Sequence, residues 1–500
     1  MHTHNGAIIL ECTNTFDAVR QRSGIIRPLA PFALNELFVK RNIPSTVINY
    51  VNAWDAVELV EVLKIWTAKH NVTQPLVLCS TLFSENLLSE KSHVANIVLE
   101  LKKVFPDLKL ILGGPINLID YSFDSLLPDA VFQGRSLHLF DRWLDNPNDP
   151  EPGTVKRVNN IPVYHRESNT VVENPIVPKL YPDYCLTKND IVQFEVRLGC
   201  KFNCTFCTFE FRNAKRVNDT DSECLTEFFA DAFDNYGITR FSCVDDTFNE
   251  DDAKIQTLRS AVSKLNFKPT IVGYNRFDIM MAKPHQAKLL DDCGFVGHYF
   301  GIETLHREAS KFIRKGINRD QALEFLRFLK VTFPHWHICS GYIIGLPKEP
   351  YEHITETHRM IRDERLIDAI IPADLGLYRI PGNEHNYSDF SNHPERYGIT
   401  VLGGNPKDLN WQHQDMDKNT AKILAKSMAA KNIKGGVTTI DPWEAVCRDA
   451  LGSEDMFGAK TYKDRMAADS GQLYSNEWYA LSNNFVAQYI QRKIIYVKNL

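Results

Sequence analysis

Short apolar runs alternate with amphipathic segments along the first 145 residues. The apolar runs, which predict buried parallel strands, are residues 7–10, 46–48, 76–79, 108–112 and 130–132. Between them, residues 32–40, 56–69 and 94–104 have the spacing of amphipathic helices. This order predicts a doubly wound α/β domain, in which ligands bind at the carboxyl ends of the strands. Gly113 and Gly114 follow the fourth run, where they allow either a close approach to a ligand or a tight turn.

A second alternating series begins near residue 186. It predicts strands at residues 191–196, 240–244, 270–274, 296–300, 337–344 and 369–377, with helices at 225–236, 252–264, 321–331 and 354–363. Six such units predict a partial (β/α)6 barrel, with its chemistry on the loops after the strands. The expected organisation is a doubly wound domain (1–145), a linker rich in Asn, Pro, Asp and Glu (146–185), the barrel (186–388) and a mostly helical C-terminal region (389–500).

Composition narrows the class of protein. Five hundred residues are too many for one core, which favours two or three domains. The formal net charge of −5 argues against a broad basic field for nucleic acid. No apolar stretch of about 18 residues predicts a membrane span, and no secretory signal opens the sequence. Eleven cysteines without such a signal predict reduced thiols in the cytoplasm.

Three of those cysteines are clustered directly after the first strand of the second series. Cys200, Cys204 and Cys207 have the spacing C-x3-C-x2-C. A short loop with three thiolates can hold an iron–sulfur cluster and leave one iron open to a further ligand. The alternative is structural zinc, which requires four closed ligands, usually in paired elements, and no second pair occurs in this sequence.

This cysteine segment resembles the cluster loop of the radical S-adenosylmethionine (SAM) superfamily, C-x3-C-x-aromatic-C, and Phe206 matches the aromatic position. The resemblance implies a [4Fe-4S] cluster whose fourth iron binds SAM. It also implies reductive cleavage of SAM to a 5′-deoxyadenosyl radical that abstracts a substrate hydrogen atom. An electron donor of the reductase or flavodoxin type is implied as well. The substrate stays open among small molecules, modified nucleotides and peptides, and no side chain is assigned a catalytic role.

Residues at the predicted strand ends extend this resemblance in the family's order. Asp245 and Asp246 end the second strand, where the family has polar groups for the SAM amino group, and Arg276 follows the third. Glu303, in the segment Gly-Ile-Glu-Thr, is similar to a family segment near the SAM ribose. Each of these residues has a structural alternative, either as a helix cap or in an ion pair with a neighbour.

The later strand ends carry further matches and one departure. Gly345 lies in a segment similar to the family's G-x-x-x-G-x-P-G pattern by the adenine, but Lys348 stands where that pattern often has Gly, which predicts a differently shaped loop. Residues 379–383 resemble the usual Y-P-G-T turn. Arg314 and Lys315 are expected on a solvated helix face rather than at the SAM carboxylate.

The N-terminal series resembles the B12-binding domain that often precedes radical SAM barrels. Many such domains carry D-x-H-x-x-G after the first strand, whereas residues 13–17 here contain no His. Cobalamin ligated through that imidazole is therefore excluded, and cobalamin bound without a His ligand stays open. The reaction stays open among rearrangement, oxidation and cobalamin-dependent methylation, with a non-catalytic iron–sulfur or SAM-binding sensor as the alternative.

Overall fold

The computed structural model describes most of the chain. The described residues are 4–12, 26–80, 92–114, 126–148, 154–158, 160–165, 173–209, 218–379, 387–406, 408–434, 437 and 471–500, without the side chains of 433 and 471–482. The predicted features at residues 13–17, 115 and 380–383 lie outside this set. The chain divides into two compact units. The first comprises Met1–Gln193, Asp231–Ile238 and Tyr479–Leu500, and the second comprises Phe194–Ala230 and Thr239–Trp478.

A seven-stranded sheet forms the core of the first unit, in the order β3-β1-β4-β5-β6-β8-β7. Its first five members are β1 (Gly6–Glu11), β3 (Ser45–Ile48), β4 (Pro75–Ser80), β5 (Lys109–Gly114) and β6 (Ala130–Gln133). These five strands are parallel, with β1 paired to both β3 and β4. The chain therefore winds outward in two directions from β1 and β4, and the doubly wound fold is confirmed.

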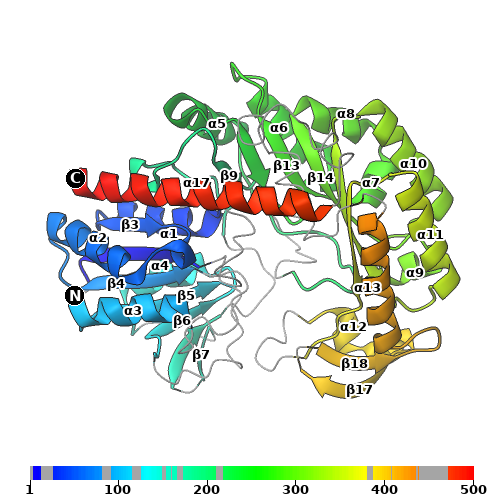
Figure 1. Ribbon diagram of the computed structural model, residues 1–500, viewed down its shortest axis with the longest axis horizontal. Helices are drawn as coiled ribbons and strands as arrows, with labels where there is room; N and C mark the ends of the chain where they lie inside the picture. Colours follow the sequence, from blue (N-terminus) through cyan, green and yellow to red (C-terminus); the bar gives the residue numbers. More distant parts are fainter. Residues whose placement is uncertain are drawn as a thin grey trace. The chain divides into compact units, whose positions relative to one another are not determined.

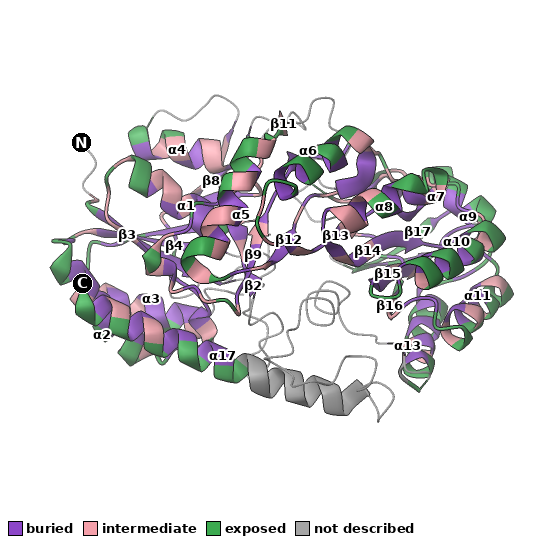
Figure 2. Cartoon of the chain, turned by 90° about the horizontal axis from the view of Figure 1, so that it is seen from above, coloured by how far each residue is buried: buried purple, intermediate pink, exposed green. Residues whose placement is uncertain are grey.

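Helices cover both faces of this sheet. They are α1 (Leu29–Lys40), α2 (Ala56–Lys69), α3 (His93–Val104) and α4 (Leu137–Asp145). Helices α1 and α4 lie together, because the rings of Phe38 and Phe140 are 6.0 Å apart. The α2 helix starts at Asp55, whose carboxylate accepts the N–H groups of Val57 and Glu58 at 3.0 and 2.9 Å. The strands are buried, whereas the helices turn exposed faces to solvent (Figures 1 and 2).

The segment expected to be a linker contains two strands. They are β7 (Val155–Val158) and β8 (Ile161–Tyr164). β8 pairs parallel to β6 and antiparallel to β7. Asn160, with φ 67°, lies in the tight turn between them, where a left-handed residue suits a two-residue hairpin loop. Strands of four residues within a polar stretch are too short to show a clear period, so the hydrophobic pattern did not reveal them.

The C-terminal helix α17 (Gly471–Asn499) completes the first unit with its second half. Tyr489 Oη accepts the backbone N–H of Asn49 at 3.0 Å. Lys493 Nζ, which is fully buried, donates to Thr46 Oγ1 at 3.0 Å and to Asp183 Oδ1 at 2.6 Å. These contacts span more than 300 residues of sequence, which local periodicity cannot predict.

Parallel strands form the core of the second unit. They are β9 (Ile191–Phe194), whose last residue belongs to this unit, β12 (Arg240–Cys243), β13 (Thr270–Asn275), β14 (Phe295–Glu303), β15 (His337–Ile344) and β16 (Ala369–Asp374). Neighbours in sequence are neighbours in the sheet. The helices between them are α5 (Ser222–Tyr236), α6 (Asp252–Val262), α7 (Phe277–Ala282), α8 (His285–Asp292), α9 (Arg307–Phe312), α10 (Arg319–Thr332) and α11 (Tyr351–Asp363). The predicted series of six βα units is thus confirmed.

The part of the chain after the barrel is not only helical. It contains the short helix α12 (Asp389–Asn392), an antiparallel hairpin of β17 (Thr400–Asn405) and β18 (Asp408–Gln412), and helix α13 (Lys418–Lys434). Trp411 of β18 is buried, and its indole N–H donates to the Leu375 carbonyl at 2.8 Å. Across the residues that the structure describes, no helix combines the length and apolar character needed to cross a bilayer.

Candidate active site

The loop that carries the three cysteines is held in place at its start. Asp245, at the end of β12, accepts the backbone N–H groups of Val196 at 2.8 Å and Arg197 at 3.0 Å. A short strand, β10 (Arg197–Leu198), follows, and Gly199 then turns the chain with φ 94°. Cys200 is therefore presented beside the carboxyl ends of the barrel strands.

Each cysteine sulfur has a hydrogen-bonding neighbour. Thr247 Oγ1 lies 3.4 Å from Cys200 Sγ, and Arg276 Nη1 donates to Cys204 Sγ at 3.3 Å. The Phe209 N–H donates to Cys207 Sγ at 3.5 Å. Hydrogen bonds to the sulfurs are a means by which proteins stabilise and tune iron–sulfur clusters. This donor set fits three cluster thiolates.

The described residues contain no group of three His, Cys, Asp or Glu side chains arranged around one metal ion. A structural zinc site requires such convergence, because all its ligands bind the same ion. A cubane cluster instead takes one thiolate at each ligated iron, so its sulfurs lie farther apart.

Residues beyond the loop fix its other end. Arg314 Nη1 donates to the Asn203 carbonyl at 2.8 Å, and Thr205 Oγ1 donates to the Phe312 carbonyl at 3.0 Å. Arg314 is 44% exposed and also pairs with Asp389. Its expected place on an exposed surface is therefore correct, and the side chain supports the cysteine loop from there.

Asp245 and Asp246, which were predicted at the SAM amino group, lie in different environments. The Asp245 carboxylate is fully buried and binds Lys254 Nζ at 2.6 Å, in addition to the two backbone N–H groups described above. Its hydrogen-bonding capacity is spent within the protein, so we do not assign it to SAM. Asp246 is half-buried. Burial raises the pKa of Cys200, and the negative charge of nearby Asp246 adds to this shift.

Arg276 belongs to the cysteine loop's surroundings. Besides its bond to Cys204, the guanidinium pairs with Asp278 at 3.0 and 2.6 Å and lies 4.0 Å from the centre of the Phe202 ring. A guanidinium held by a carboxylate and an aromatic ring has a fixed orientation. The structure therefore directs Arg276 toward a cluster sulfur.

Glu303 and Lys315 form a buried ion pair, in contrast to the solvated face expected for Lys315. Lys315 is only 1% exposed, and its Nζ lies 3.2 Å from Glu303 Oε1 and 2.5 Å from the Gly301 carbonyl oxygen. It also lies 5.6 Å from the centre of the Phe206 ring. Glu303 has φ 63°, and the strand register shifts between Gly301 and Glu303. Such a bulge changes the direction of a side chain at a strand end.

Two tyrosines near this pair were not predicted. Tyr274 and Tyr299 meet edge to face, with ring centres 5.2 Å apart. A Cβ atom at Gly301 would lie 2.2 Å from the Tyr274 hydroxyl, so only glycine leaves room for that hydroxyl. Burial, followed by the negative charge of Glu303, raises the pKa of Tyr274 well above its usual value. Tyrosines within strands usually belong to a core, and nothing in the local sequence marks these as different.

Packing alone explains the glycine at position 345. Gly345 has φ 91°, and a Cβ atom there would lie 2.4 Å from the Trp411 ring. Lys348 adopts φ 71°, and its N–H donates to Asp415 Oδ2 at 3.0 Å. The backbone of Lys348 thus takes the left-handed conformation that favours glycine. The differently shaped loop expected at this position stays a prediction. The assignment of Gly345 to the adenine stays a prediction.

Comparison of the sequence with known proteins identifies the barrel. Residues 195–361 match the sequence model of the radical SAM superfamily. An uncharacterized methyltransferase of Pyrococcus horikoshii is 26% identical over 244 residues, which are 46% of this chain and 48% of that protein. The tRNA-2-methylthio-N(6)-dimethylallyladenosine synthase of Corynebacterium diphtheriae is 24% identical over 191 residues, 35% of this chain and 36% of that protein. The chain therefore spans about half or less of these curated relatives.

Solved structures have a similar fold. The radical SAM methyltransferase TsrM from Kitasatospora setae, with cobalamin and a [4Fe-4S] cluster bound, matches with a TM-score of 0.57 at 12% identity, over 97% of this chain and 99% of that one. The cobalamin-dependent SAM radical enzyme OxsB, with aqua-cobalamin bound, matches with a TM-score of 0.61 at 12% identity, over 97% of this chain and 72% of that one. At such identity the likeness shows the fold.

The fold and the loop define a protein that contains a doubly wound domain and a cysteine-bearing partial barrel. Residues 195–361 of that barrel are a radical SAM domain. The superfamily and fold predicted from the cysteine spacing and the strand ends are thereby confirmed. The cofactors of a radical SAM domain are a [4Fe-4S] cluster and SAM.

Proposed function

We propose that this protein is a radical SAM enzyme that abstracts a hydrogen atom from an unactivated carbon of its substrate. The observation that carries the proposal is the cysteine loop, in which each of the three sulfurs has a hydrogen-bonding neighbour. When bound, the cluster and SAM supply a 5′-deoxyadenosyl radical by reductive cleavage. The superfamily match over residues 195–361 supports the same chemistry.

The side chains around the loop have distinct proposed roles. Cys200, Cys204 and Cys207 hold the cluster, and Arg276 donates to one of its sulfurs. Lys315, a buried cation with Glu303 as its only carboxylate partner among the described residues, is suited to the SAM carboxylate. Asp246 stays our candidate for the SAM amino group, because it is half-buried near Cys200.

The test is SAM cleavage by protein reconstituted anaerobically with iron and sulfide. Reduced protein should form 5′-deoxyadenosine, and Ala in place of Cys200, Cys204 or Cys207 should abolish it. Cys224 is exposed and lies outside the loop, so Cys224→Ala is the matched control and should retain activity. A cluster-loaded protein that never cleaves SAM, even with candidate substrates, would instead favour a sensor.

Two further proposals concern the cellular compartment and the electron donor. Outside the cluster loop, Cys185 is half-buried and Cys224 is exposed, and both are free thiols suited to a reducing compartment, so we place the enzyme in the cytoplasm. Its electron donor is then a reductase or a flavodoxin-type protein. Flavodoxin with its reductase should support 5′-deoxyadenosine formation in place of dithionite. Failure of every such protein donor to replace dithionite would contradict this assignment.

A second candidate function is cobalamin-dependent methylation, and a group of buried polar atoms in the first unit favours it. Asn49 and Tyr50 directly follow β3, and the Arg27 guanidinium lies between the rings of Tyr50 and Tyr489, at 5.0 and 4.5 Å. Arg27 Nη1 and Nη2, the Tyr50 hydroxyl and both amide atoms of Asn49 are buried and hydrogen bonded to nothing in the described structure. Buried polar groups without partners are costly. A ligand at this edge of the sheet would satisfy them.

The amide side chains on the rim of a corrin ring offer both acceptors and donors to such a group. The carboxyl edge of a doubly wound sheet is where ligands bind, and TsrM and OxsB were solved with cobalamin bound. Protein made with hydroxocobalamin should therefore retain a corrinoid spectrum. Tyr50→Phe should lower its corrinoid content without lowering the midpoint of unfolding, since the lost hydroxyl bonds to no protein group. Wild-type protein without corrinoid absorption bands would exclude this candidate.

A further inference from the structure

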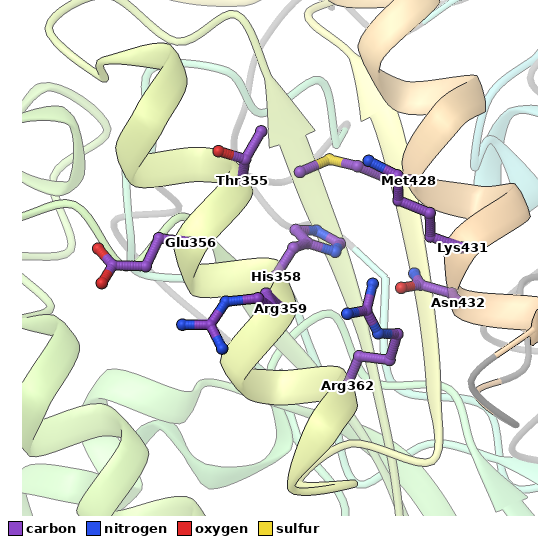
Figure 3. A pocket seen from close by; sticks show the side chains of 8 residues that line it. All are labelled: Thr355, Glu356, His358, Arg359, Arg362, Met428, Lys431 and Asn432. Atoms are coloured by element: carbon purple, nitrogen blue, oxygen red, sulfur yellow. The ribbon is translucent and has the colours of Figure 1, made fainter.

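A cavity of about 420 Å³ lies between α11 and α13, outside the site described above. Its lining comes from two helices of the second unit: Thr355, Glu356, His358, Arg359, Arg362, Met428, Lys431 and Asn432. Figure 3 shows His358 and Arg362 from α11 facing Asn432 from α13. Helix α11 follows β15 and packs outside the barrel, whereas the cysteine loop lies at the carboxyl ends of the strands.

The floor of this cavity holds two buried polar side chains, each with one nitrogen that has no hydrogen-bond partner among the described residues. His358 is 4% exposed and Asn432 is 2% exposed. His358 Nε2 and Asn432 Nδ2 form no hydrogen bond to any described residue. Burial lowers the pKa of His358 to about 4, although a side-chain hydrogen bond with Asn432 opposes this shift, so its imidazole is uncharged at neutral pH. Because an unsatisfied buried polar group is destabilising, both point to a neutral polar partner within the cavity.

Positive charge flanks this floor. Lys431 is exposed and forms no ion pair with a carboxylate of the described residues, and Arg362 is 23% exposed. Arg362 binds Asp363 through Nε and Nη2, which leaves Nη1 available. The carboxylate of Glu356 points away from the groove (Figure 3) and pairs with Arg319 at 2.7 Å. Cations therefore outnumber the carboxylates that face the cavity, which favours an anionic ligand.

We propose that this cavity binds a small phosphate monoester, with its phosphate at Arg362 and Lys431 and its uncharged polar body at His358 and Asn432. The volume falls within the range of small-molecule sites, about 300–1,000 Å³, and exceeds what a phosphate alone would fill. Met428, which is 3% exposed, gives the carbon skeleton an apolar surface. The site is separate from SAM cleavage, so it stands or falls independently of the proposed function.

The experiment is calorimetric titration of the anaerobic, cluster-loaded enzyme with ribose 5-phosphate, inorganic phosphate and ribose. Ribose 5-phosphate should bind most tightly. Arg362→Gln and Lys431→Gln should each weaken it at least tenfold, and Lys422→Gln, an equal charge change at an exposed position of α13 outside the cavity, should not. The rate of 5′-deoxyadenosine formation without the sugar phosphate should be the same in all three variants.

The Asn432→Leu variant tests whether Asn432 contacts the bound sugar phosphate or only stabilises the protein. It should weaken ribose 5-phosphate more than inorganic phosphate, because Asn432 Nδ2 has no protein partner and is available to the uncharged body of the ligand. The proposal is overturned if ribose 5-phosphate does not bind at millimolar concentration. It is equally overturned if the Arg362 and Lys431 variants bind it as well as wild type, or if folded Asn432→Leu binds ribose 5-phosphate as tightly as wild type.

Discussion

The buried pair of Asp245 and Lys254 gives the sharpest test of how this site is built. Both side chains are fully buried, with Nζ and Oδ2 2.6 Å apart, and the Asp245 carboxylate also accepts the N–H groups of Val196 and Arg197. In Asp245→Asn one oxygen becomes an NH2 group, which cannot accept from the N–H group it faces, and Lys254 keeps only the more distant Glu250, at 3.7 Å, as a buried carboxylate partner. Breaking such a pair costs about 3–5 kcal/mol. Each kcal/mol of lost stability lowers the thermal unfolding midpoint of a domain of this size by about 2–4 °C. The midpoint of Asp245→Asn should therefore fall by roughly 6–20 °C.

The assay is thermal unfolding of the apo-protein, combined with SAM binding to the reconstituted enzyme. In Asp245→Asn/Lys254→Met both charges are absent, so the double variant should recover part of the loss, and the mutant cycle should give a coupling energy above about 1 kcal/mol. Asp246→Asn is the matched control at the next residue. It should change stability by less than about 0.5 kcal/mol and weaken SAM binding. If Asp245→Asn unfolds like wild type and only weakens SAM binding, then Asp245 binds SAM and its structural role is refuted.

The same pair predicts a dependence on alkaline pH. Burial lowers the pKa of Lys254, but the charges of Asp245 and Glu250 outweigh this effect and raise the pKa above its ordinary value. A lysine whose folded pKa is raised adds stability that is fully present below the unfolded value of about 10.4 and is lost as the pH rises through the folded value. The difference in unfolding midpoint between wild type and Lys254→Met should therefore stay constant at neutral pH and shrink only above about pH 10.4. A difference that shrinks at neutral pH would contradict this assignment.

Three further predictions follow from single contacts. Arg276→Gln removes a positive charge and a hydrogen-bond donor to Cys204, so the reduction potential of the cluster should fall by tens of millivolts in an EPR-monitored titration. An unchanged potential would mean that Arg276 does not act on the cluster. Lys493→Met leaves Asp183 without its buried cation, so unfolding should become easier by at least about 2 kcal/mol, and a neutral effect would mean that α17 does not depend on this lysine. Lys348 has a left-handed φ of 71°, which glycine adopts without strain, so Lys348→Gly should stabilise the protein by up to about 1 kcal/mol in chemical denaturation. A loss of stability would mean that the Lys348 side chain stabilises this turn by its packing.

The main strands were predictable because parallel strands buried on both faces appear as continuous apolar runs. The strand predicted at residues 337–344 coincides with β15, and the helix predicted at 56–69 coincides with α2. The hairpin of β7 and β8 and the place of α17 were not predictable in this way. The hairpin strands have four residues each, and α17 depends on partners such as Asp183 that lie some 300 residues away in the sequence. A hydrophobic pattern reports the burial of a segment but not its partner.

The cofactor residues show the same limit at a finer scale. The spacing of the three cysteines predicts the cluster site, because its ligands come from one short loop. Asp245 and Asp246 are equivalent in sequence, yet their side chains leave the backbone in different directions, and only the first meets Lys254. Lys315 was expected on a solvated face, and the positive φ of Glu303 brings the two side chains together instead. A charged residue that already forms an ion pair within the protein is not available to a cofactor. Which residues form such pairs depends on how distant segments pack together, and the local sequence does not show this.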